Sequence, residues 1–292
     1  MRDLHPTLGH KAWGRRKAAY VFAALFTAVG GVACILSVGL GWMSATPLDV
    51  YFSAAMFFIL WLPFIALIDN PGEAPRSRVE RWSEFGFVWL LVSGIAQTFW
   101  ELPWFFLDLT GVVHQISEQD RWLWTWWAYG GADTRYLTSN PTIAGLEFMA
   151  GFSGPVELYA YWLYSTSKTM QQKMRACWIA LIIGVGLTYQ TGVFFIAEWH
   201  VDWVHIQQGA TGFWLKFFGL NLPWLVAPVF ALPAAVYELA HWYRVQGYEM
   251  ALQQHGLDPG ALVAASKARV VSPSATVTVA APAVAAFAET RG

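Results

Sequence analysis

The stretch Phe85–Leu107, FGFVWLLVSGIAQTFWELPWFFL, decides the fold class. It is longer than the roughly 20 apolar residues that a helix needs to cross the hydrocarbon core of a membrane. It carries a single charged residue, Glu101. A charged residue at mid-membrane costs on the order of 3 kcal/mol and is tolerated where it faces the interior of a helix bundle. The stretch therefore predicts a membrane-spanning helix with a carboxylate on its inner face.

Five further stretches of similar length and apolarity lie on either side of it. Hydrophobic residues make up 56% of the chain and charged residues only 13%, too few to cover the surface of a soluble domain. The net charge of −1 argues against nucleic acid as a partner. We therefore predict an all-α, polytopic transmembrane helix bundle with six spans: Ala18–Met43, Val50–Ile68, Phe85–Leu107, Thr142–Tyr164, Ala176–Glu198 and Leu222–Tyr243.

The distribution of basic residues predicts the orientation of these spans. Of the 18 Lys and Arg residues, all except Arg121, Arg135 and Lys216 fall on the side of the two termini. Basic loops stay on the cytosolic side of a membrane. We predict a cytosolic basic arm at 1–17, a bundle at 18–243 and a cytosolic tail at 244–292. Because the tail is rich in Ala, Val, Pro and Ser, we expect disorder from about residue 270.

Metal and disulfide chemistry are poorly supported by the sequence. Cys34 and Cys177 lie in apolar stretches and predict buried thiols without a disulfide framework. The segment Glu198–His205 has the composition of a metal-ligand cluster, but the chain holds only 7 histidines in all. It has neither a phosphate-binding glycine loop nor a dinucleotide fingerprint. We predict no metal and no cofactor.

Several acidic residues within the predicted spans are candidates for chemistry. Gln97 and Glu101 are four residues apart and share a helix face, while Glu147 and Glu157 are ten apart and point roughly the same way. A buried carboxyl group favours its neutral form and can act as an acid, while a second carboxylate takes up a proton. Aromatic faces stabilise a cation between them, for which Trp100, Trp104 and Trp224 are candidates. Glu238 lies near a span end, where a structural role is expected.

Four short strings, taken together, resemble the emopamil-binding protein family, also called the EXPERA family. They are Asp133-Thr134-Arg135-Tyr136, the span from Glu147 through Gly154-Pro155, Gly186-x-x-Tyr189 running to Glu198, and Asn221-x-x-Trp224-x-x-x-Pro228. The resemblance covers about 94–231 and identifies the chain as a divergent member. The family comprises sterol Δ8–Δ7 isomerases of the endoplasmic reticulum, and its relatives include the sigma-2 receptor.

The resemblance implies a cavity in which a sterol alkene is protonated, the cation rests against an aromatic face and a proton leaves a neighbouring carbon. It implies that Glu101 and Glu147 are the two carboxylates and that Trp224 with Asn221 faces the cation. Two positions depart from the pattern. Gln97 stands where the isomerases carry a His, so Glu101 acts alone or with Asp133, and Thr191 stands where we expect an acidic residue. Val50–Ile68 is a span beyond the five of the family.

The sequence therefore predicts an intramembrane isomerase or terpene cyclase that acts on a sterol or other terpenoid by alkene protonation or epoxide opening. A non-catalytic sterol-binding or lipid-binding protein like the sigma-2 receptor is the alternative. The expected location is the endoplasmic reticulum membrane, with membrane lipid and a lipid-soluble substrate as partners, and a homodimer is left open. The predicted catalytic residues are Glu101, Glu147 and Asp133. The predicted substrate-binding residues are Gln97, Trp100, Trp104, Arg135, Tyr189, Glu198, Asn221 and Trp224.

Overall fold

A computed structural model describes residues 11–69, 76–167, 169–256 and 258, with side chains from Arg16 onward. The predicted basic arm lies largely outside these residues, as does the predicted disordered tail from about residue 270. The chain divides between Tyr243 and Arg244 into two units, and the cavities described below lie in the unit Arg2–Tyr243. Among the described residues the fold is helical, and the extended pairing consists of a single antiparallel bridge between Asp133 and Ile206.

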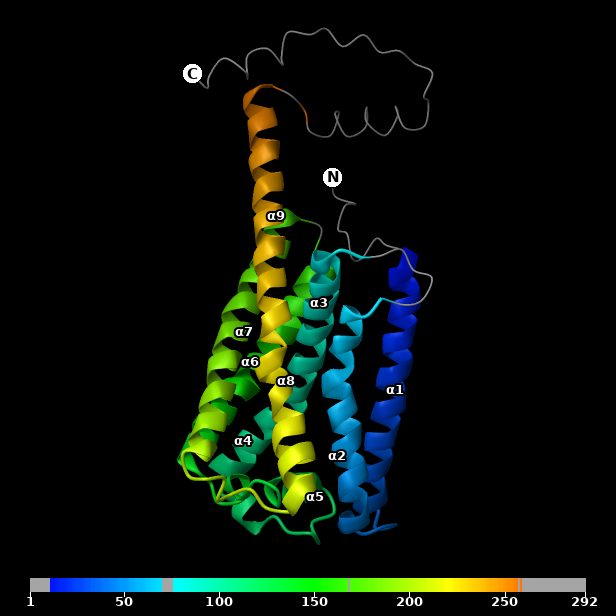
Figure 1. Cartoon of the computed structure of the whole chain (residues 1–292), viewed down its shortest axis with the longest axis vertical. Coiled ribbons are helices and arrows are strands. Elements are labelled where there is room, and N and C mark those ends of the chain that lie inside the picture. The colour runs from blue at the N-terminus through cyan, green and yellow to red at the C-terminus, as the bar shows by residue number, and fades with distance from the viewer. Residues whose placement is uncertain (1–10, 70–75, 168, 257, 259–292) are drawn as a thin grey trace. The chain divides into compact units, whose positions relative to one another are not determined.

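Five helical segments are long and apolar enough to cross a membrane, which confirms an integral membrane protein (Figure 1). These five spans are Arg16–Gly39, Ala45–Leu67, Arg78–Leu109, Met170–Trp199 and Thr211–Gln254. The helices that build them are α1 (Lys11–Gly39), α2 (Ala45–Trp61), α3 (Arg78–Ala96), α4 (Leu102–Leu109), α7 (Met170–Trp199), α8 (Leu220–Val226) and α9 (Pro228–Gln254).

The ends of the predicted spans differ from those in the structure. The first helix ends at Gly39 instead of Met43, because Gly41 takes a left-handed φ of 76° that stops the helix. The third begins at Arg78, seven residues before Phe85, because Ser77 and Glu80 form a capping box. Hydropathy alone does not predict these ends, since one depends on the backbone conformation of a glycine and the other on polar capping residues.

The predicted span Thr142–Tyr164 corresponds to α6 (Pro141–Thr166), which begins at an Asn140 cap. It packs against α3 and α7. It is 26 residues long but does not meet the apolarity that the other five spans meet. Glu147 and Glu157 are buried along it.

Buried ion pairs fasten the α1–α2 hairpin to the rest of the bundle. Glu84 on α3 accepts hydrogen bonds from Arg16 at 2.9 Å, from Arg76 at 2.7 Å and from the Tyr20 hydroxyl at 2.7 Å. Near the other end of α2, Asp49 pairs with the fully buried Lys216. Because a buried charge is stable only when it is paired, these contacts fix the place of the hairpin.

A local widening of the helix separates α3 from α4. Residues Gln97–Glu101 form a π-helical turn, η2, in which the Leu102 N–H donates to the Gln97 carbonyl. Pro103 follows directly, and a proline cannot donate a hydrogen bond and clashes with the carbonyl four residues before it. The wide turn accommodates this proline, and such turns occur frequently at functional sites.

Two glycines bring α6 unusually close to this turn. A Cβ on Gly154 would lie 2.6 Å from the Thr98 backbone nitrogen, and one on Gly151 would lie 2.7 Å from the Leu102 Cα. Only glycine permits this approach without a backbone shift. The close contact brings the buried carboxylates of α6 to the side of the bundle that carries Gln97 and Glu101.

Candidate functional site

The carboxylate cavity, about 360 Å³ of empty space, lies between η2, α6, α7 and α8. Five residues named from the sequence line it together, although they come from separate parts of the chain. The lining residues are Gln97, Glu101, Tyr136, Leu146, Glu147, Ala150, Leu187, Gln190, Thr191, Phe194, Asn221 and Trp224. The predicted pair of carboxylates and the predicted aromatic ring therefore share one cavity.

The two carboxylates of the cavity differ in their partners. Glu147 accepts a short hydrogen bond on Oε1 from the Tyr136 hydroxyl, while its Oε2 has no partner. The Oε2 atom of Glu101 is also buried and has no hydrogen-bond partner. Glu101 and Glu147 lie close enough for their charges to interact, and the charge of Glu157 also acts on Glu101. Because like charges repel, two neighbouring carboxyl groups are suited to separate roles as an acid and a base.

Tyr136 holds Glu147 and is itself held by aromatic neighbours. Its ring packs edge-on against Trp104 at 5.0 Å between centroids and against Tyr129 at 4.8 Å. The Trp104 indole N–H donates to the Tyr136 carbonyl at 3.2 Å. Tyr136 precedes α6, and burial, with the nearby Glu147 charge, raises the pKa of its phenol well above the usual value. Tyr136 therefore remains a hydrogen-bond donor.

The Ser93 hydroxyl connects three sides of the cavity wall. It accepts hydrogen bonds from the Trp224 indole N–H at 3.0 Å and from the Gln97 amide at 3.1 Å, and it lies within hydrogen-bonding reach of Glu157. The indole of Trp224 is thereby fixed at the cavity wall by its nitrogen. The Gln97 Oε1 atom is buried without a partner.

Asn221 and Gln190 complete the polar lining. The Asn221 amide donates to the Tyr129 hydroxyl at 2.7 Å and to the Phe217 carbonyl at 2.6 Å. The Gln190 amide donates to the Leu146 carbonyl at 2.7 Å, while its Oε1 has no partner. Buried polar atoms in proteins are almost always hydrogen-bonded, so several unpartnered oxygens around one cavity mark a place for donors on a bound molecule or on the acids themselves.

Asp133, Arg135 and Glu198 lie in a different place, which we call the loop ion cluster, together with His205. Arg135 forms a two-point pair with Asp133, at 2.9 and 2.6 Å, and contacts Glu198 at 3.3 Å. Glu198 also accepts the His205 backbone N–H at 2.9 Å. Burial raises the pKa of Asp133, and the Arg135 guanidinium beside it acts in the opposite direction.

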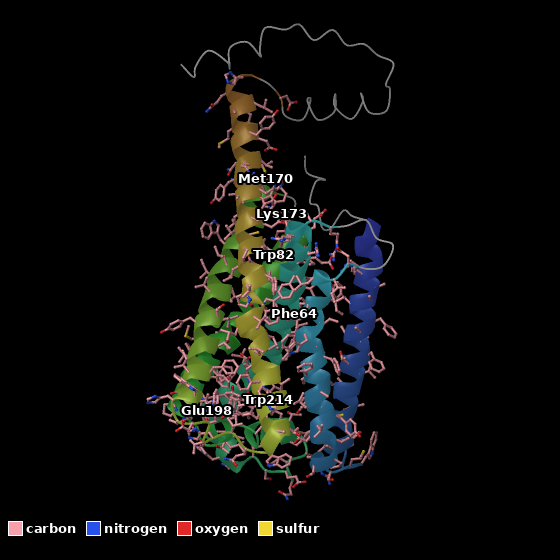
Figure 2. All side chains as sticks on the ribbon, viewed as in Figure 1. Phe64, Trp82, Met170, Lys173, Glu198 and Trp214 are labelled. Carbon is pink, nitrogen blue, oxygen red and sulfur yellow. The ribbon has the colours of Figure 1, made fainter. Side chains whose placement is uncertain are left out.

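The loop ion cluster is next to the carboxylate cavity but does not line it. The Arg135 guanidinium lies over the Phe194 ring, 4.6 Å from its centroid. Phe194 in turn lines the carboxylate cavity. Figure 2 shows Glu198 at the end of α7 opposite to Met170 and Lys173. The segment Glu198–His205, which has the composition of a metal-ligand cluster, contributes to an ion-pair network. Within residues 11–69, 76–167 and 169–256 no group of three His, Cys, Asp or Glu could hold a metal ion.

Three other residues named from the sequence lie outside the cavity lining. Trp100 stacks on Trp126 at 5.3 Å, and Trp104 supports Tyr136 from behind. Tyr189 is 75% exposed on the outer face of α7. Their predicted roles in substrate binding stay predictions.

Sequence reasoning did not select Tyr136, Gln190 or Ser93 as site residues. Tyr136 was within reach, because it ends the string Asp133-Thr134-Arg135-Tyr136, but nothing in that string indicates that its hydroxyl meets Glu147. Gln190 is the neighbour of Tyr189, and only the helix orientation decides which of the two faces inward.

Comparison with curated proteins finds steroid isomerases. A probable 3β-hydroxysteroid Δ8,Δ7-isomerase of Oryza sativa subsp. japonica is 23% identical over 149 residues, which cover 39% of this chain and 65% of the rice protein. The 3β-hydroxysteroid Δ8,Δ7-isomerase of Cavia porcellus is 24% identical over 189 residues, 64% of this chain and 75% of the relative. The chain is a distant homologue of these isomerases, in agreement with its resemblance to the emopamil-binding protein family.

This finding confirms the resemblance stated from the four sequence strings. The matched part spans just under two thirds of the rice relative and three quarters of the guinea-pig relative. A scan against protein-family models finds no match. The likeness to the emopamil-binding protein family therefore rests on distant pairwise similarity.

Proposed function

We propose that this emopamil-binding protein relative is an intramembrane isomerase or cyclase that acts on a sterol or other terpenoid through a carbocation. The observation that carries the proposal is the meeting of Glu101, Glu147 and Trp224 at one buried cavity. Two carboxyl groups without a metal or a nucleophile are suited to moving protons, and the indole face is suited to a passing positive charge. The relatives act on 3β-hydroxysteroids, as their names state, which supports a steroid or similar polycyclic substrate.

In the proposed reaction Glu101 is the acid. Its neutral carboxyl group donates a proton to an alkene carbon, or to an epoxide oxygen whose C–O bond then breaks, and a carbocation forms beside Trp224. Glu147 then takes a proton from a neighbouring carbon, and the electrons of that C–H bond close the new alkene. The Tyr136 hydroxyl donates to Glu147 and stabilises its ionised form, which suits Glu147 to the role of base.

Gln97 favours the epoxide variant over simple alkene isomerisation. Its amide neither releases nor takes up a proton, so the residue at position 97 does not assist Glu101 in proton transfer. An epoxide oxygen is far more basic than an alkene carbon, and a lone carboxylic acid suffices to open it. The terpene-cyclase reading rests on this residue.

Gln97 also supports the alternative of a non-catalytic sterol-binding protein like the sigma-2 receptor. In that case the unpartnered oxygens of the cavity would hold a ligand without turnover. The membrane setting is the same for both: six spans with α6 as the sixth, both termini in the cytosol, and residence in the endoplasmic reticulum.

Turnover in deuterated water separates these proposals. Membranes that contain the wild type, Glu101→Gln or Glu147→Gln are incubated with candidate sterols and terpenoid epoxides, and products are analysed by mass spectrometry. We expect each substitution to lower turnover about a hundredfold to ten-thousandfold, the range for loss of a general acid or base. Deuterium in the product marks alkene protonation at carbon. Saturable sterol binding with no product from any candidate would instead establish the binding protein.

A further inference from the structure

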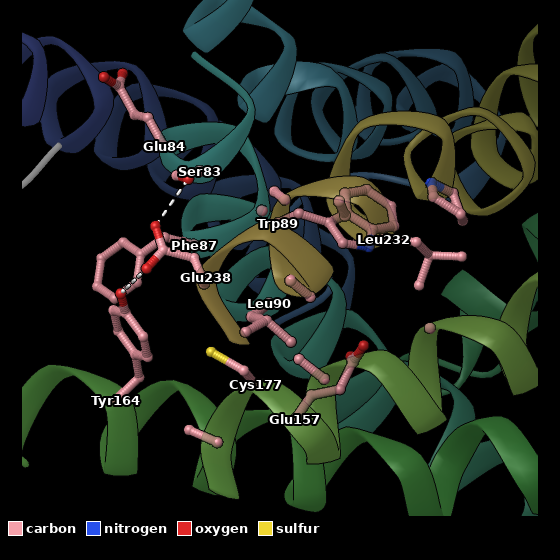
Figure 3. A pocket seen from close by; sticks show the side chains of 18 residues that line it. Ser83, Glu84, Phe87, Trp89, Leu90, Glu157, Tyr164, Cys177, Leu232 and Glu238 are labelled. Carbon is pink, nitrogen blue, oxygen red and sulfur yellow. Dashed lines mark hydrogen bonds between the residues drawn. The ribbon is translucent and has the colours of Figure 1, made fainter. Parts of the chain in front are cut away.

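A second and larger cavity, about 780 Å³ of empty space, lies between α3, α6, α7 and α9 (Figure 3). We call it the α9 cavity. Small side chains keep it open: Ala176, Ala180 and Gly184 recur every four residues along one face of α7 and line it. Ala231 and Ala235 face it from α9. Most of its wall is therefore apolar, as in pockets that hold lipids and other small molecules.

Glu157 contributes a carboxyl oxygen without a hydrogen-bond partner to this wall. Its side chain is 2% exposed, and its Oε2 atom is buried without a hydrogen-bond partner. Figure 3 shows its carboxyl group projecting from α6 into the cavity. Glu238, by contrast, accepts hydrogen bonds from Ser83 at 2.9 Å and Tyr164 at 3.2 Å. The cavity thus offers one carboxyl oxygen to a ligand in an otherwise apolar setting.

The α9 cavity adjoins the carboxylate cavity through a single layer of side chains. Trp224 lines the carboxylate cavity, and its ring is 5.6 Å from that of Trp89, which lines the α9 cavity. The Ser93 hydroxyl bonds Trp224 on one side and reaches Glu157 on the other. Glu101 and Glu157 interact electrostatically across this layer.

We propose that the α9 cavity is a second chamber, separated from the carboxylate cavity by these side chains, and that it holds the apolar body of an elongated terpenoid alcohol whose hydroxyl group bonds Glu157. A hydroxyl group both donates and accepts, so it satisfies a carboxyl group in either protonation state.

Photolabelling tests the chamber without requiring turnover. The probe is a 3β-hydroxysterol with a diazirine and an alkyne tag, applied to full-length protein in membranes, and labelled peptides are mapped by mass spectrometry. We expect labels on α7 and α9 peptides that line the cavity. Ala180→Phe places a ring in the cavity and should lower labelling about tenfold, because the ring takes space that the probe needs.

Ile182→Phe is the matched control, because Ile182 is on the same helix but 66% exposed on its outer face. It should leave labelling unchanged. Equal labelling of wild type and Ala180→Phe, or labels confined to other helices, would overturn the proposal. If Ala180→Phe does not fold, as judged by gel filtration, the smaller Ala180→Leu is used in its place.

Substitution of Glu157 tests the hydroxyl contact. Glu157→Leu should weaken binding of the hydroxylated probe about tenfold and leave its 3-deoxy counterpart unchanged, whereas Glu157→Gln should retain both. Equal losses for the two probes would show that Glu157 does not bond the hydroxyl. If Glu101→Gln abolishes turnover while Ala180→Phe does not change labelling, the second chamber fails and the proposed function stands. Labelling that follows these expectations with no turnover of any substrate would leave the chamber standing and remove the catalytic function.

Discussion

Two groups of buried charge lie on either side of Phe194, and they differ in how completely they are paired. In the loop ion cluster Asp133, Arg135 and Glu198 satisfy one another at 2.6–3.3 Å. In the carboxylate cavity Glu101 and Glu147 each keep a buried oxygen without a partner. Both groups contain acidic residues that the sequence nominated for the site.

The difference indicates two kinds of role. A buried charge whose partners are all present stabilises the local fold, since removal of one partner leaves the other unpaired. Unpartnered polar atoms around a cavity lower stability and persist where they are used. We therefore expect substitutions in the loop ion cluster to change stability, and substitutions in the carboxylate cavity to change turnover.

Arg135→Leu should give the largest effect on stability. It leaves Asp133 and Glu198 buried without their cation, which typically costs about 3–5 kcal/mol. The measurement is the melting temperature of the purified protein in detergent, followed by gel filtration, with Glu101→Gln as the control that should melt like the wild type. If Arg135→Leu melts like the wild type but has lost turnover per folded molecule, the loop ion cluster takes part in the reaction. The division between a stabilising cluster and a catalytic cavity would then be wrong.

Tyr136→Phe should give a smaller effect that falls mainly on turnover. The change keeps the ring between Trp104 and Tyr129 but removes the hydroxyl that donates to Glu147. Loss of this hydrogen bond should lower turnover about tenfold, with a stability change of about 1 kcal/mol.

Initial rates over a range of substrate concentrations check this prediction. Because Tyr136 acts through Glu147, kcat should fall more than KM changes, and the pH profile of kcat should shift. A purely structural Tyr136 would lower the melting temperature and leave the pH profile of the remaining activity as it is in the wild type.

Much of this arrangement could be predicted from the sequence, because a membrane span requires a long apolar stretch. Long apolar stretches predicted the spans, while their ends were missed where the Ser77–Glu80 capping box and Gly41 decide them. Glu101 and Glu147 were selected because a carboxyl group is costly in an apolar helix. Their shared cavity additionally requires the π-helical turn at Gln97–Glu101 and the close approach of Gly154, which depend on packing between helices.

The sequence could not separate Asp133 and Glu198 from the other two acids. Both are acidic residues at helix ends or loops within the family-like strings. Asp133 pairs with Arg135 two residues away, and the pair between Arg135 and Glu198 joins segments about 60 residues apart. Hydropathy and residue spacing carry no information on such long-range pairs. The same limit explains why the α9 cavity was not foreseen, since it is bounded by four separate helices.

The smallest effect on turnover is expected at Tyr189, and the neighbouring residue Gln190 provides a direct comparison. Tyr189 is 75% exposed on α7, while Gln190 is 9% exposed and lines the carboxylate cavity. Tyr189→Phe should change turnover less than about twofold, as is usual for surface changes away from buried contacts. Gln190→Leu removes a donor to the Leu146 carbonyl and an oxygen of the cavity, so it should raise KM several times more than Tyr189→Phe does. The measurement is KM for the same substrate in both variants. A larger effect at Tyr189 would mean that substrate contacts the outer face of α7, and the carboxylate cavity would then be only part of the site.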